Sequence, residues 1–515
     1  MPVQTSYPGV YVEEVPSGVK TISGVSTSIA AFIGSATKGH ENEPTTIFNY
    51  GDYERVFGGL SNDSPMSFAV RDFFQHGGGE AIIVRVTNSV TKATKSFFDF
   101  ADEDGIDTTS AFKIEASSSG VWGDGICFWI DYKTKTDPDN ELFNLFIEDK
   151  DGKSETFLNL SIVENSPVFA INVLKQKSEL IGMRKLTESA TSILRPAASS
   201  VDGDGVITKQ SLSGGGDGAD ISSTEVKGSE TDKTGLYALE KTDIFNILCI
   251  PPYSKTADIE AATYNDVMPY CKRRRAVLLI DCPSWGDIQA AITGLGNFDK
   301  DNYAALYFPR LLKPNPLKNN QIEEFVPCGA VAGVLARTDT ERGVWKAPAG
   351  TEANLSGVSG FSVPLTDQEN GKLNQLGINC LRSFPVYGKV VWGARTLQGA
   401  DVLASEWKYL PVRRTALYIE ESLFRGLKWV VFEPNDEPLW GQIRLNVGAF
   451  MHNMFRQGAF QGQKKDAYFV KCDSETTTQN DINLGAVNIV VGFAPLKPAE
   501  FVILKIQQIA GQIDV

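Results

Sequence analysis

The sequence is poor in the side chains from which catalytic and metal sites are usually built. Its 515 residues include three His, namely His40, His76 and His452, and no two of these have the spacing of metal ligands or of a nucleophile with its base. The seven Cys form no C-x-x-C pair, and their number is odd. The cysteines therefore indicate reduced thiols in a protein that folds in a cytoplasm, rather than a disulfide framework or a zinc site. We expect no catalytic residue, no cofactor and no metal ion.

Long apolar runs and an excess of positive charge are also missing. No stretch approaches the ~20 consecutive apolar residues of a transmembrane helix. The start, "MPVQTSYPGVYVEEVPSG", lacks the basic region and apolar run of a secretory signal peptide. The formal net charge is −14, and an acidic chain repels phosphate backbones. We therefore expect neither direct membrane insertion nor binding to nucleic acid.

Apolar side chains are plentiful, at 42% of the sequence, and a chain of this length should form roughly two to four domains. Residues 1–20 alternate around Val10 and Val12 between prolines, which predicts an extended arm with a short strand. Residues 21–87 predict the first part of a compact core, with the strand "STSIAAFIGSA", the helix "SPMSFAVRDFFQHGGG" and the strand "EAIIVRV". Ser64 is the expected N-cap of that helix.

The composition changes twice along the rest of the chain. Residues 88–235 are rich in Ser, Thr, Asp and Gly with short apolar runs, which predicts an inserted β-rich domain that a loose Gly-rich linker closes. Residues 236–400 alternate helical stretches with continuous apolar runs such as "RRAVLLIDCP", which predicts a largely parallel sheet covered by helices. Residues 401–498 include two predicted helices, and residues 499–515 carry the strand-like "EFVILKIQQI". The predicted fold class is therefore α/β (α+β), with a β-rich insertion and extended terminal arms.

Three short motifs are candidates for ligand binding, and each has a plainer interpretation. In "HGGGE" the glycines follow a predicted helix, whereas a phosphate-binding loop places them before one, so a helix C-cap is favoured. In "DGDGVITKQSL", Asp202 and Asp204 lack the third acidic ligand and the final Glu of a calcium loop, which favours a turn. Asp281 ends a strand, where α/β enzymes often place functional groups, but a strand-end cap explains it as well.

Many stretches match the contractile tail sheath family in the same order. In the C-terminal half they are "GVLARTDTERGVWKAPAG", "LNQLGINCLRSFP", "VVWGARTL", "WKYLPVRRTALYIEESLFRGLKWVVFEPNDEPLW", "GAFQG" and "APLKPAEFVILKIQQ". The N-terminal half adds "YPGVYVEEVPSG", "TSIAAFIG" and "FFQHGGGEAIIVRV". The chain thus closely resembles the sheath proteins of long-tailed contractile phages, R-type bacteriocins and extracellular contractile injection systems. Residues 88–235 match nothing in that family, where this part varies.

The resemblance implies a mechanical function without covalent chemistry. Sheath subunits of this family stack as sixfold rings around an inner tube, and a baseplate signal triggers contraction that drives the tube through a target envelope. The implied partners are further copies of the chain, the inner tube protein, and the baseplate and tail-terminator or cap proteins. Such a subunit is assembled in the bacterial cytoplasm and becomes part of a phage tail or of a released or cell-associated particle. A non-contractile assembly or adhesion protein, and an α/β enzyme, are the alternatives.

The resemblance also implies where subunits meet. Family members are joined by terminal arms that add strands to a sheet of a neighbour, although the residues alone allow pairing within the subunit equally well. The segment 333–350 carries four charged residues without His or Cys, which suits ion pairs and a rigid turn better than acid–base chemistry. The candidate intersubunit residues are Val10, Val12, Arg337, Asp339, Glu341, Arg342, Val502, Leu504 and Ile506.

The stretch 438–465 is a candidate for contact with the inner tube, which the family holds through a helix late in the chain. This stretch contains no Asp or Glu, in contrast to the acidic chain as a whole. Its apolar residues at helical spacing should face the core; they are Trp440, Ile443, Val447, Met451 and Met454. The candidate tube contacts are Arg444, Arg456, Lys464 and Lys465, although charge alone would favour an ordinary solvated face.

Overall fold

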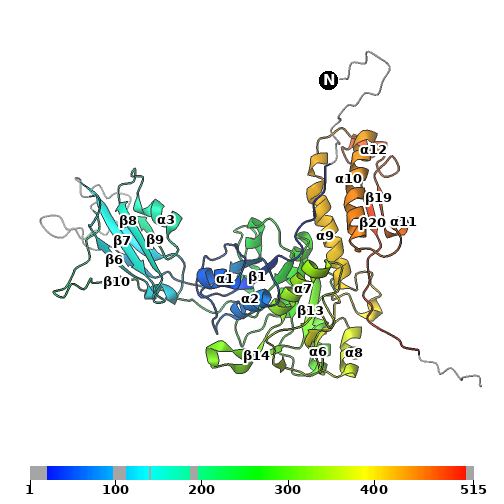
Figure 1. Cartoon of the computed structure of the whole chain (residues 1–515), viewed down its shortest axis with the longest axis horizontal. Helices are drawn as coiled ribbons and strands as arrows, with labels where there is room; N and C mark the ends of the chain where they lie inside the picture. The colour runs from blue at the N-terminus through cyan, green and yellow to red at the C-terminus, as the bar shows by residue number, and fades with distance from the viewer. Residues whose placement is uncertain (1–19, 97–111, 138–140, 186–194, 506–515) are drawn as a thin grey trace, which may run out of the picture.

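A computed structural model describes residues 20–96, 112–137, 141–185 and 195–505, and these form three parts arranged in a row (Figure 1). A central α/β unit has a β-rich unit on one side and an upright helical unit on the other. The helical unit is drawn in orange to red, and the described chain ends below it. None of the helices in these ranges combines the length and apolarity needed to cross a membrane.

The central unit is built on an eight-stranded sheet with the order β18-β17-β13-β12-β11-β1-β3-β2. The strands are β1 (Ala30–Gly34), β2 (Thr45–Ile47), β3 (Ala81–Arg85), β11 (Ile247–Cys249), β12 (Val277–Asp281), β13 (Ala304–Phe308), β17 (Asn379–Phe384) and β18 (Gly388–Val391). Pairing is parallel from β17 to β3 and antiparallel at the two edge strands. The predicted mixed, largely parallel sheet is confirmed.

Helices cover both faces of this sheet because its strands are apolar on both sides. In β1, Ala31 and Ile33 face one apolar cluster, while Ala30 and Phe32 face the other, as the alternation of a strand requires. The first cluster contains residues of α5 (Ala261–Arg273), α6 (Ile288–Gly294) and α8 (Asp367–Gln375). The second contains residues of α1 (Tyr50–Phe57), α2 (Pro65–Gln75) and α7 (Cys328–Arg342).

Two local predictions about α2 and its neighbour can be followed in detail. Ser64 caps α2, since its side chain accepts a hydrogen bond from the backbone N–H of Ser67, and His76 with Gly77 ends the helix. Helix α7 lies directly on α2 because Gly333 leaves room for it: a Cβ there would lie 2.5 Å from the Phe73 carbonyl oxygen. The small residues at the start of α7 therefore serve close helix packing.

The β-rich unit is an excursion between β3 and β11, which are separated by β1 alone in the sheet. It contains β4 (Thr94–Ser96), β5 (Phe112–Ala116) and β9 (Ile181–Lys185) in one sheet, and β6 (Cys127–Asp131), β7 (Leu142–Glu148), β8 (Ser154–Ser161) and β10 (Gln210–Ser211) in another, with α3 (Ala170–Lys177) beside them. Asn88 pairs with Ala219 at its neck.

The chain leaves this unit near residue 219, not near 235 as the composition suggested. Ile221, Val226 and Leu236 belong to the apolar core of the central unit, and Val226 lies on the short helix α4 (Ser223–Lys227). The predicted loose linker is therefore wrong in its second half. Ser and Gly dominate the composition of this stretch, but its few apolar residues pack into the core of the central unit.

A small antiparallel sheet, β15-β14-β16, projects from the central unit; its strands are β14 (Leu311–Asn315), β15 (Gln321–Phe325) and β16 (Gly360–Phe361). The helical unit contains α9 (Leu410–Gly426) and α10 (Glu437–Arg456) side by side, with α11 (Lys464–Ala467), α12 (Gln479–Asn483), β19 (Tyr468–Lys471) and β20 (Val490–Phe493) (Figure 1). All five predicted apolar residues of α10 are buried, which confirms its core-facing stripe. Leu417 of α9 packs in the central unit and Ile419 in the helical one, so α9 joins the two.

Candidate assembly surfaces

The first ten described residues, 20–29, form a strap along the helical unit. The backbone N–H of Lys20 donates to the Asn446 side chain at 3.1 Å, and that of Val25 donates to the Ser422 hydroxyl at 3.2 Å. Ile22 is buried with the apolar residues of α10. The strap therefore holds Lys20, the first described residue, near the end of the helical unit that lies away from the central unit (Figure 1).

A buried ion pair holds the base of this strap. The Asp339 carboxylate accepts two hydrogen bonds from the Arg414 guanidinium, at 2.8 and 2.5 Å, and both side chains are only 3% exposed. Thr27 of the strap donates its hydroxyl to Asp339 at 2.7 Å and accepts from Arg414 through its carbonyl at 2.9 Å. The pair thus joins α7, α9 and the strap.

This geometry corrects part of the prediction for segment 333–350. Helix α7 continues to Arg342, so a turn forms only after that residue. The Asp339 carboxylate is 3% exposed and accepts three hydrogen bonds from Arg414 and Thr27 of its own chain; its contact with a neighbour stays a prediction. Arg337 donates to the Asn354 side chain at 2.7 Å, and Arg342 pairs with Glu352 at 2.9 Å. Glu341 is exposed, and in the described residues it has no ion-pair partner.

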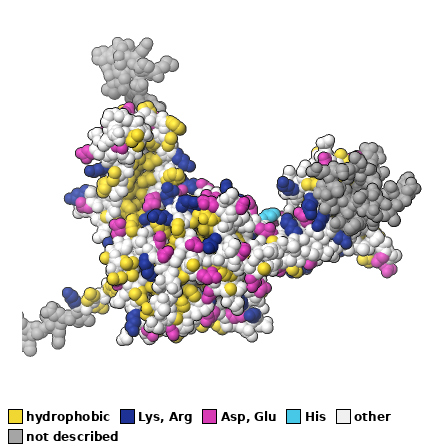
Figure 2. All heavy atoms as spheres, turned by 180° about the vertical axis from the view of Figure 1, so that it is seen from behind, with side chains coloured by type: hydrophobic (Ala, Val, Ile, Leu, Met, Phe, Trp, Pro, Cys, Tyr) yellow, Lys and Arg dark blue, Asp and Glu magenta, His cyan; other side chains and the backbone are white. Residues whose placement is uncertain are grey.

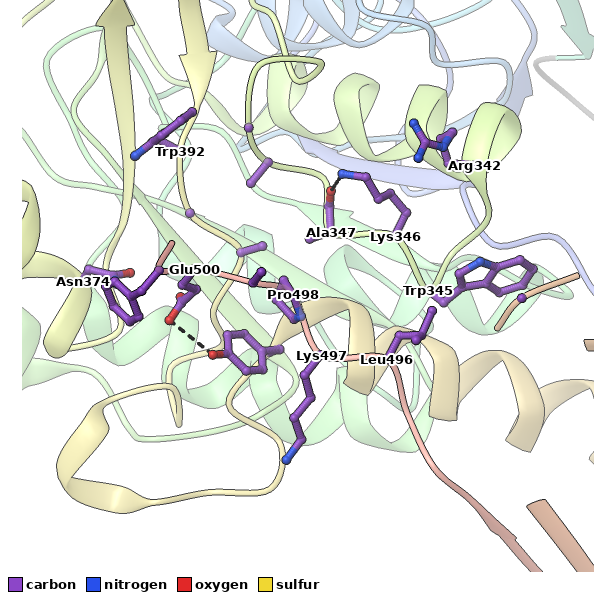
Figure 3. Close-up of a pocket in the computed structure, with 18 of the residues that line it drawn as sticks. Arg342, Trp345, Lys346, Ala347, Asn374, Trp392, Leu496, Lys497, Pro498 and Glu500 are labelled. Carbon is purple, nitrogen blue, oxygen red and sulfur yellow. Dashed lines mark hydrogen bonds between the residues drawn. The ribbon is translucent and has the colours of Figure 1, made fainter. Parts of the chain in front are cut away.

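A second buried guanidinium, that of Arg395, holds the other end of the chain. Its side chain is 0% exposed, and it donates to the two carboxylate oxygens of Glu500 at 2.8 and 2.5 Å. The Tyr409 hydroxyl also donates to Glu500, at 3.2 Å, which is the dashed line in Figure 3. Because Glu500 lies near the end of the described chain, this ion pair ties the C-terminal segment to the central unit.

Between β20 and Glu500 the chain crosses a hollow in the surface. This cavity has a volume of about 700 Å³, and Trp345, Lys346 and Trp392 line it opposite Lys497 and Pro498 (Figure 3). The crossing segment, residues 494–500, is called the tether below. Its first residue exchanges backbone hydrogen bonds with Gln461 and Ala467. The motif that ends in "GVWKAPAG" therefore forms one wall of a hollow that the tether spans.

Beyond Glu500 the chain is apolar and exposed. Phe501, Val502, Ile503 and Leu504 are 74–81% exposed and adopt no strand. The predicted strand is thus not formed within residues 501–505 of a single subunit, because an isolated strand has no partner for its backbone groups. The candidates Val502 and Leu504 lie in this exposed segment, while Val10, Val12 and Ile506 lie outside the described residues.

The helical unit carries a two-stranded antiparallel sheet, in which Tyr468 pairs with Phe493 and Lys471 with Val490. Within the ranges that the structure describes, neither β19 nor β20 pairs with a further strand. Hydrophobic side chains gather along one face of this unit, as Figure 2 shows. The sequence prediction missed this sheet, although the aromatic and β-branched residues of "AYFVK" and "NIVVGF" were a visible signal.

The four basic candidates differ in their surroundings. Arg444 forms an ion pair with Glu437 at 2.5 Å and donates to the Cys472 carbonyl, so its charge is already compensated. Glu437 was not among the residues considered for the stretch 438–465 because it lies one residue before that stretch. Arg456, Lys464 and Lys465 are exposed and have no ion pair with any described residue.

The remaining polar motifs have structural roles. His76 accepts a hydrogen bond from the Ser356 backbone at Nε2, and burial lowers the pKa of its imidazole. Asp202 accepts from two backbone N–H groups of its own turn. Asp281 accepts from the backbone N–H of Cys328 at the start of α7, which agrees with a strand-end cap. In the described parts of the chain no group of three or more His, Cys, Asp or Glu side chains could hold a metal ion.

A chain with unpaired sheet edges and an exposed apolar end is typical of a subunit that assembles with other copies. Comparison with known families is specific: residues 191–397 match the phage tail sheath protein central domain, and residues 404–509 match the phage tail sheath C-terminal domain. These two matches cover more than half of the sequence. The chain belongs to the phage tail sheath protein family.

Individual relatives agree with this assignment. The tail sheath protein of Vibrio phage KVP40 is 27% identical over 189 residues, which are 36% of this chain and 27% of the relative. The tail sheath protein of Enterobacteria phage T4 is 24% identical over 200 residues, which are 38% of this chain and 29% of the relative. The matched part thus spans less than a third of the length of these curated relatives.

Solved structures show the same fold over nearly the whole chain. The sheath of the extracellular contractile injection system PVC in the contracted state is 22% identical, with 98% of both chains covered and a TM-score of 0.58. The contracted helical sheath of the anti-feeding prophage is 24% identical, with 98% of this chain and 100% of that chain covered, at 0.58. The sheath tail protein from Listeria innocua is 13% identical, with 92% and 96% covered, at 0.61.

Proposed function

We propose that this chain is the structural subunit of a contractile tail sheath. Copies of the chain would stack as sixfold rings around an inner tube, and contraction of the sheath would drive that tube through a target envelope. The observation that carries the proposal is the exposed apolar segment 501–504. This segment directly follows Glu500, which a buried ion pair with Arg395 holds on the central unit. The chain also belongs to the tail sheath family. No covalent step is part of this function, and no enzymatic role is proposed.

The terminal segments are the proposed links between subunits. Residues 501 onward, with Val502, Leu504 and Ile506, would add a strand to the sheet β19–β20 of a neighbour, and the segment around Val10 and Val12 would do the same. Strand addition supplies backbone hydrogen bonds to both partners and removes the apolar side chains from water. Because the link is made by backbone pairing of terminal segments rather than by the faces of folded units, it can persist while the subunits rotate against one another.

The inner tube is proposed to meet the basic end of α10 and α11. Arg456, Lys464 and Lys465 are exposed and unpaired among the described residues, whereas Arg444 is compensated by Glu437 and contributes less. Exposed ion pairs are individually weak, at about 0–1 kcal/mol, but they would repeat at every subunit. Such a contact can hold in the extended state and release when all subunits move together.

The β-rich unit is proposed to face outward and to play no part in holding the lattice. The backbone N–H of Ala219 donates to the carbonyl of Asn88 at 2.9 Å, so the two ends of this unit meet at its neck. Replacing residues 89–218 with a short Gly-Ser linker should therefore leave a folded core that assembles. Loss of assembly in a core that still unfolds cooperatively would contradict this part of the proposal.

The baseplate and a tail-terminator or cap protein are the further partners that this function requires. The subunit would be assembled in the bacterial cytoplasm and would then belong to a phage tail or a released or cell-associated particle. A non-contractile assembly or adhesion protein is the second candidate, which the large β-rich unit favours.

Electron microscopy of the purified chain tests the central proposal. We expect hollow tubes or stacked rings from the intact chain, and folded single subunits after deletion of residues 501–515. Circular dichroism and thermal unfolding of the deletion variant serve as the control for folding. Monodisperse particles from the intact chain under all conditions, or normal tubes from the deletion variant, would contradict the proposed assembly.

A further inference from the structure

We infer that the ion pair between Arg395 and Glu500 is a fixed pivot for the C-terminal segment. Glu500 keeps the root of the segment on the central unit, and the chain changes direction only from Phe501 onward. This inference rests on the proposed function, in which the segment links neighbouring subunits. Glu500 is thus a positioning residue that sets where every link begins.

Arg395 is mounted on the rigid part of the protein. The side-chain oxygen of Asn379, in β17 of the central sheet, accepts from the Arg395 backbone N–H at 2.6 Å. The side-chain nitrogen of Asn379 donates back to the Arg395 carbonyl at 2.8 Å and to the Leu306 carbonyl of β13 at 3.1 Å. The backbone of Arg395 therefore cannot move without the sheet, and a pivot attached to it has a fixed position.

Each of the three guanidinium nitrogens of Arg395 donates a hydrogen bond. Besides Glu500, its guanidinium donates to the Asn374 carbonyl at 2.7 Å, the Gly399 carbonyl at 3.0 Å and the Asp401 carboxylate at 2.9 Å. Glu500 accepts from the other two nitrogens, Nε and Nη2, and its own side chain is 17% exposed. The Arg395 side chain is 0% exposed, so Glu500 and its other protein partners take the place of water around it.

The charges around the pivot balance only while Glu500 is in place. Two cations, Arg395 and Lys408, lie beside two anions, Asp401 and Glu500, with Lys408 at 2.7 Å from Asp401 and 3.8 Å from Glu500. If Glu500 withdrew, Arg395 would keep only one of its two carboxylate partners, and it would share that partner, Asp401, with Lys408. Removing one partner of a buried ion pair is strongly unfavourable, which distinguishes a fixed pivot from a latch that opens during contraction.

The chain on either side of the pivot has opposite properties. Before Glu500, the tether contains Pro495 and Pro498, whose fixed φ angles stiffen it. After Glu500, the four apolar residues are exposed and carry no hydrogen bond to the described residues. The change in direction between subunit states is therefore confined to the bonds just after Glu500.

The test compares Glu500→Gln with Asp401→Asn, which removes the other carboxylate of Arg395 without touching the C-terminal segment. Limited digestion with chymotrypsin, which can cut after Leu496 and Phe501, reports on whether the tether is held, and electron microscopy reports on tubes. We expect Glu500→Gln to raise the rate of cleavage at these two positions by about tenfold or more, because a buried charge pair is lost, and to reduce regular tubes severely. Asp401→Asn should form tubes as the intact chain does.

Each outcome bears on the inference. Wild-type protection and normal tubes in Glu500→Gln would overturn it, as would equal tube loss in Asp401→Asn, since the ion pair would then serve folding alone. If Glu500→Gln does not fold, Glu500→Asp retains the charge one methylene shorter; partial protection and fewer tubes are expected, and full tube yield with an unprotected tether would contradict the pivot. Normal tubes after deletion of 501–515 would instead contradict the proposed function itself.

Discussion

At the start of the described chain, Thr27 hydrogen-bonds to an ion pair that belongs entirely to the body of the protein, Asp339 with Arg414. At its end, Glu500 itself supplies the carboxylate for Arg395. The N-terminal strap can therefore leave without unbalancing a buried charge, whereas the C-terminal segment cannot. The strap depends on many weak contacts along residues 20–29, and the C-terminal segment depends on one strong contact at a single residue.

The largest loss in the free energy of unfolding should come from breaking the ion pair between Asp339 and Arg414. Asp339→Asn leaves the Arg414 guanidinium buried without a counter-charge, and the loss of one partner of a buried pair costs about 3–5 kcal/mol. Urea unfolding of the isolated subunit measures this change. A loss below about 1 kcal/mol, the range of a surface pair, would mean that this pair does not hold α7, α9 and the strap together.

Asp281 is a buried carboxyl group that, unlike Asp339, forms no ion pair with a described Arg. Burial raises the pKa of the Asp281 carboxyl to about 7, above the ordinary value of about 3.9. The folded state therefore binds the proton more tightly, so the stability of the intact chain should fall relative to Asp281→Asn as pH rises from about 4 to 7, and level off above that. Unfolding of both proteins across this range tests the sign, and a stability difference that does not change with pH would contradict it.

Removing only the contact of the strap should have a smaller effect. Thr27→Val deletes the hydroxyl that donates to Asp339 but leaves the ion pair with Arg414 in place. A single hydrogen bond to a charged group contributes about 1.5–3 kcal/mol at most, and the retained Arg414 pair should keep the loss near the lower figure. Parallel urea unfolding of Thr27→Val and Asp339→Asn checks this order. Equal losses in the free energy of unfolding would show that the ion pair stabilises the protein only through its contact with the strap.

The smallest effect on folding should come from the exposed basic residues. Arg456→Glu combined with Lys464→Glu should change the free energy of unfolding by less than about 0.5 kcal/mol, since both side chains are exposed. Assembly with the tube should nevertheless fail, giving empty or prematurely contracted sheaths in the microscope. Extended, tube-filled particles with unchanged salt sensitivity would show that this face does not contact the tube.

Features encoded locally were predictable from the sequence, and pairings between distant residues were not. The cap at Ser64 and the buried stripe of α10 follow from spacing along a few turns, and continuous apolar runs indicated the parallel sheet. By contrast, Asp339 meets Arg414 across 75 positions and Arg395 meets Glu500 across 105 positions. Charge and spacing in the sequence do not specify which partners the fold brings together. The charged motif around Asp339 therefore looked like an interface, although the Asp339 side chain is buried against Arg414 of the same chain.

The most direct test of the account is a cysteine cross-link between subunits. Val502→Cys in the C-terminal segment, combined with Phe469→Cys or Val490→Cys on the sheet β19–β20, places thiols on the two surfaces proposed to meet, and Cys127→Ser removes the one native thiol that is not buried. Mixing two populations that carry one cysteine each separates links between subunits from links within one. Strand addition between subunits predicts a disulfide-linked ladder from assembled tubes and none from dissociated subunits. Tubes that form normally but give no cross-link with either sheet position would contradict strand addition by the C-terminal segment.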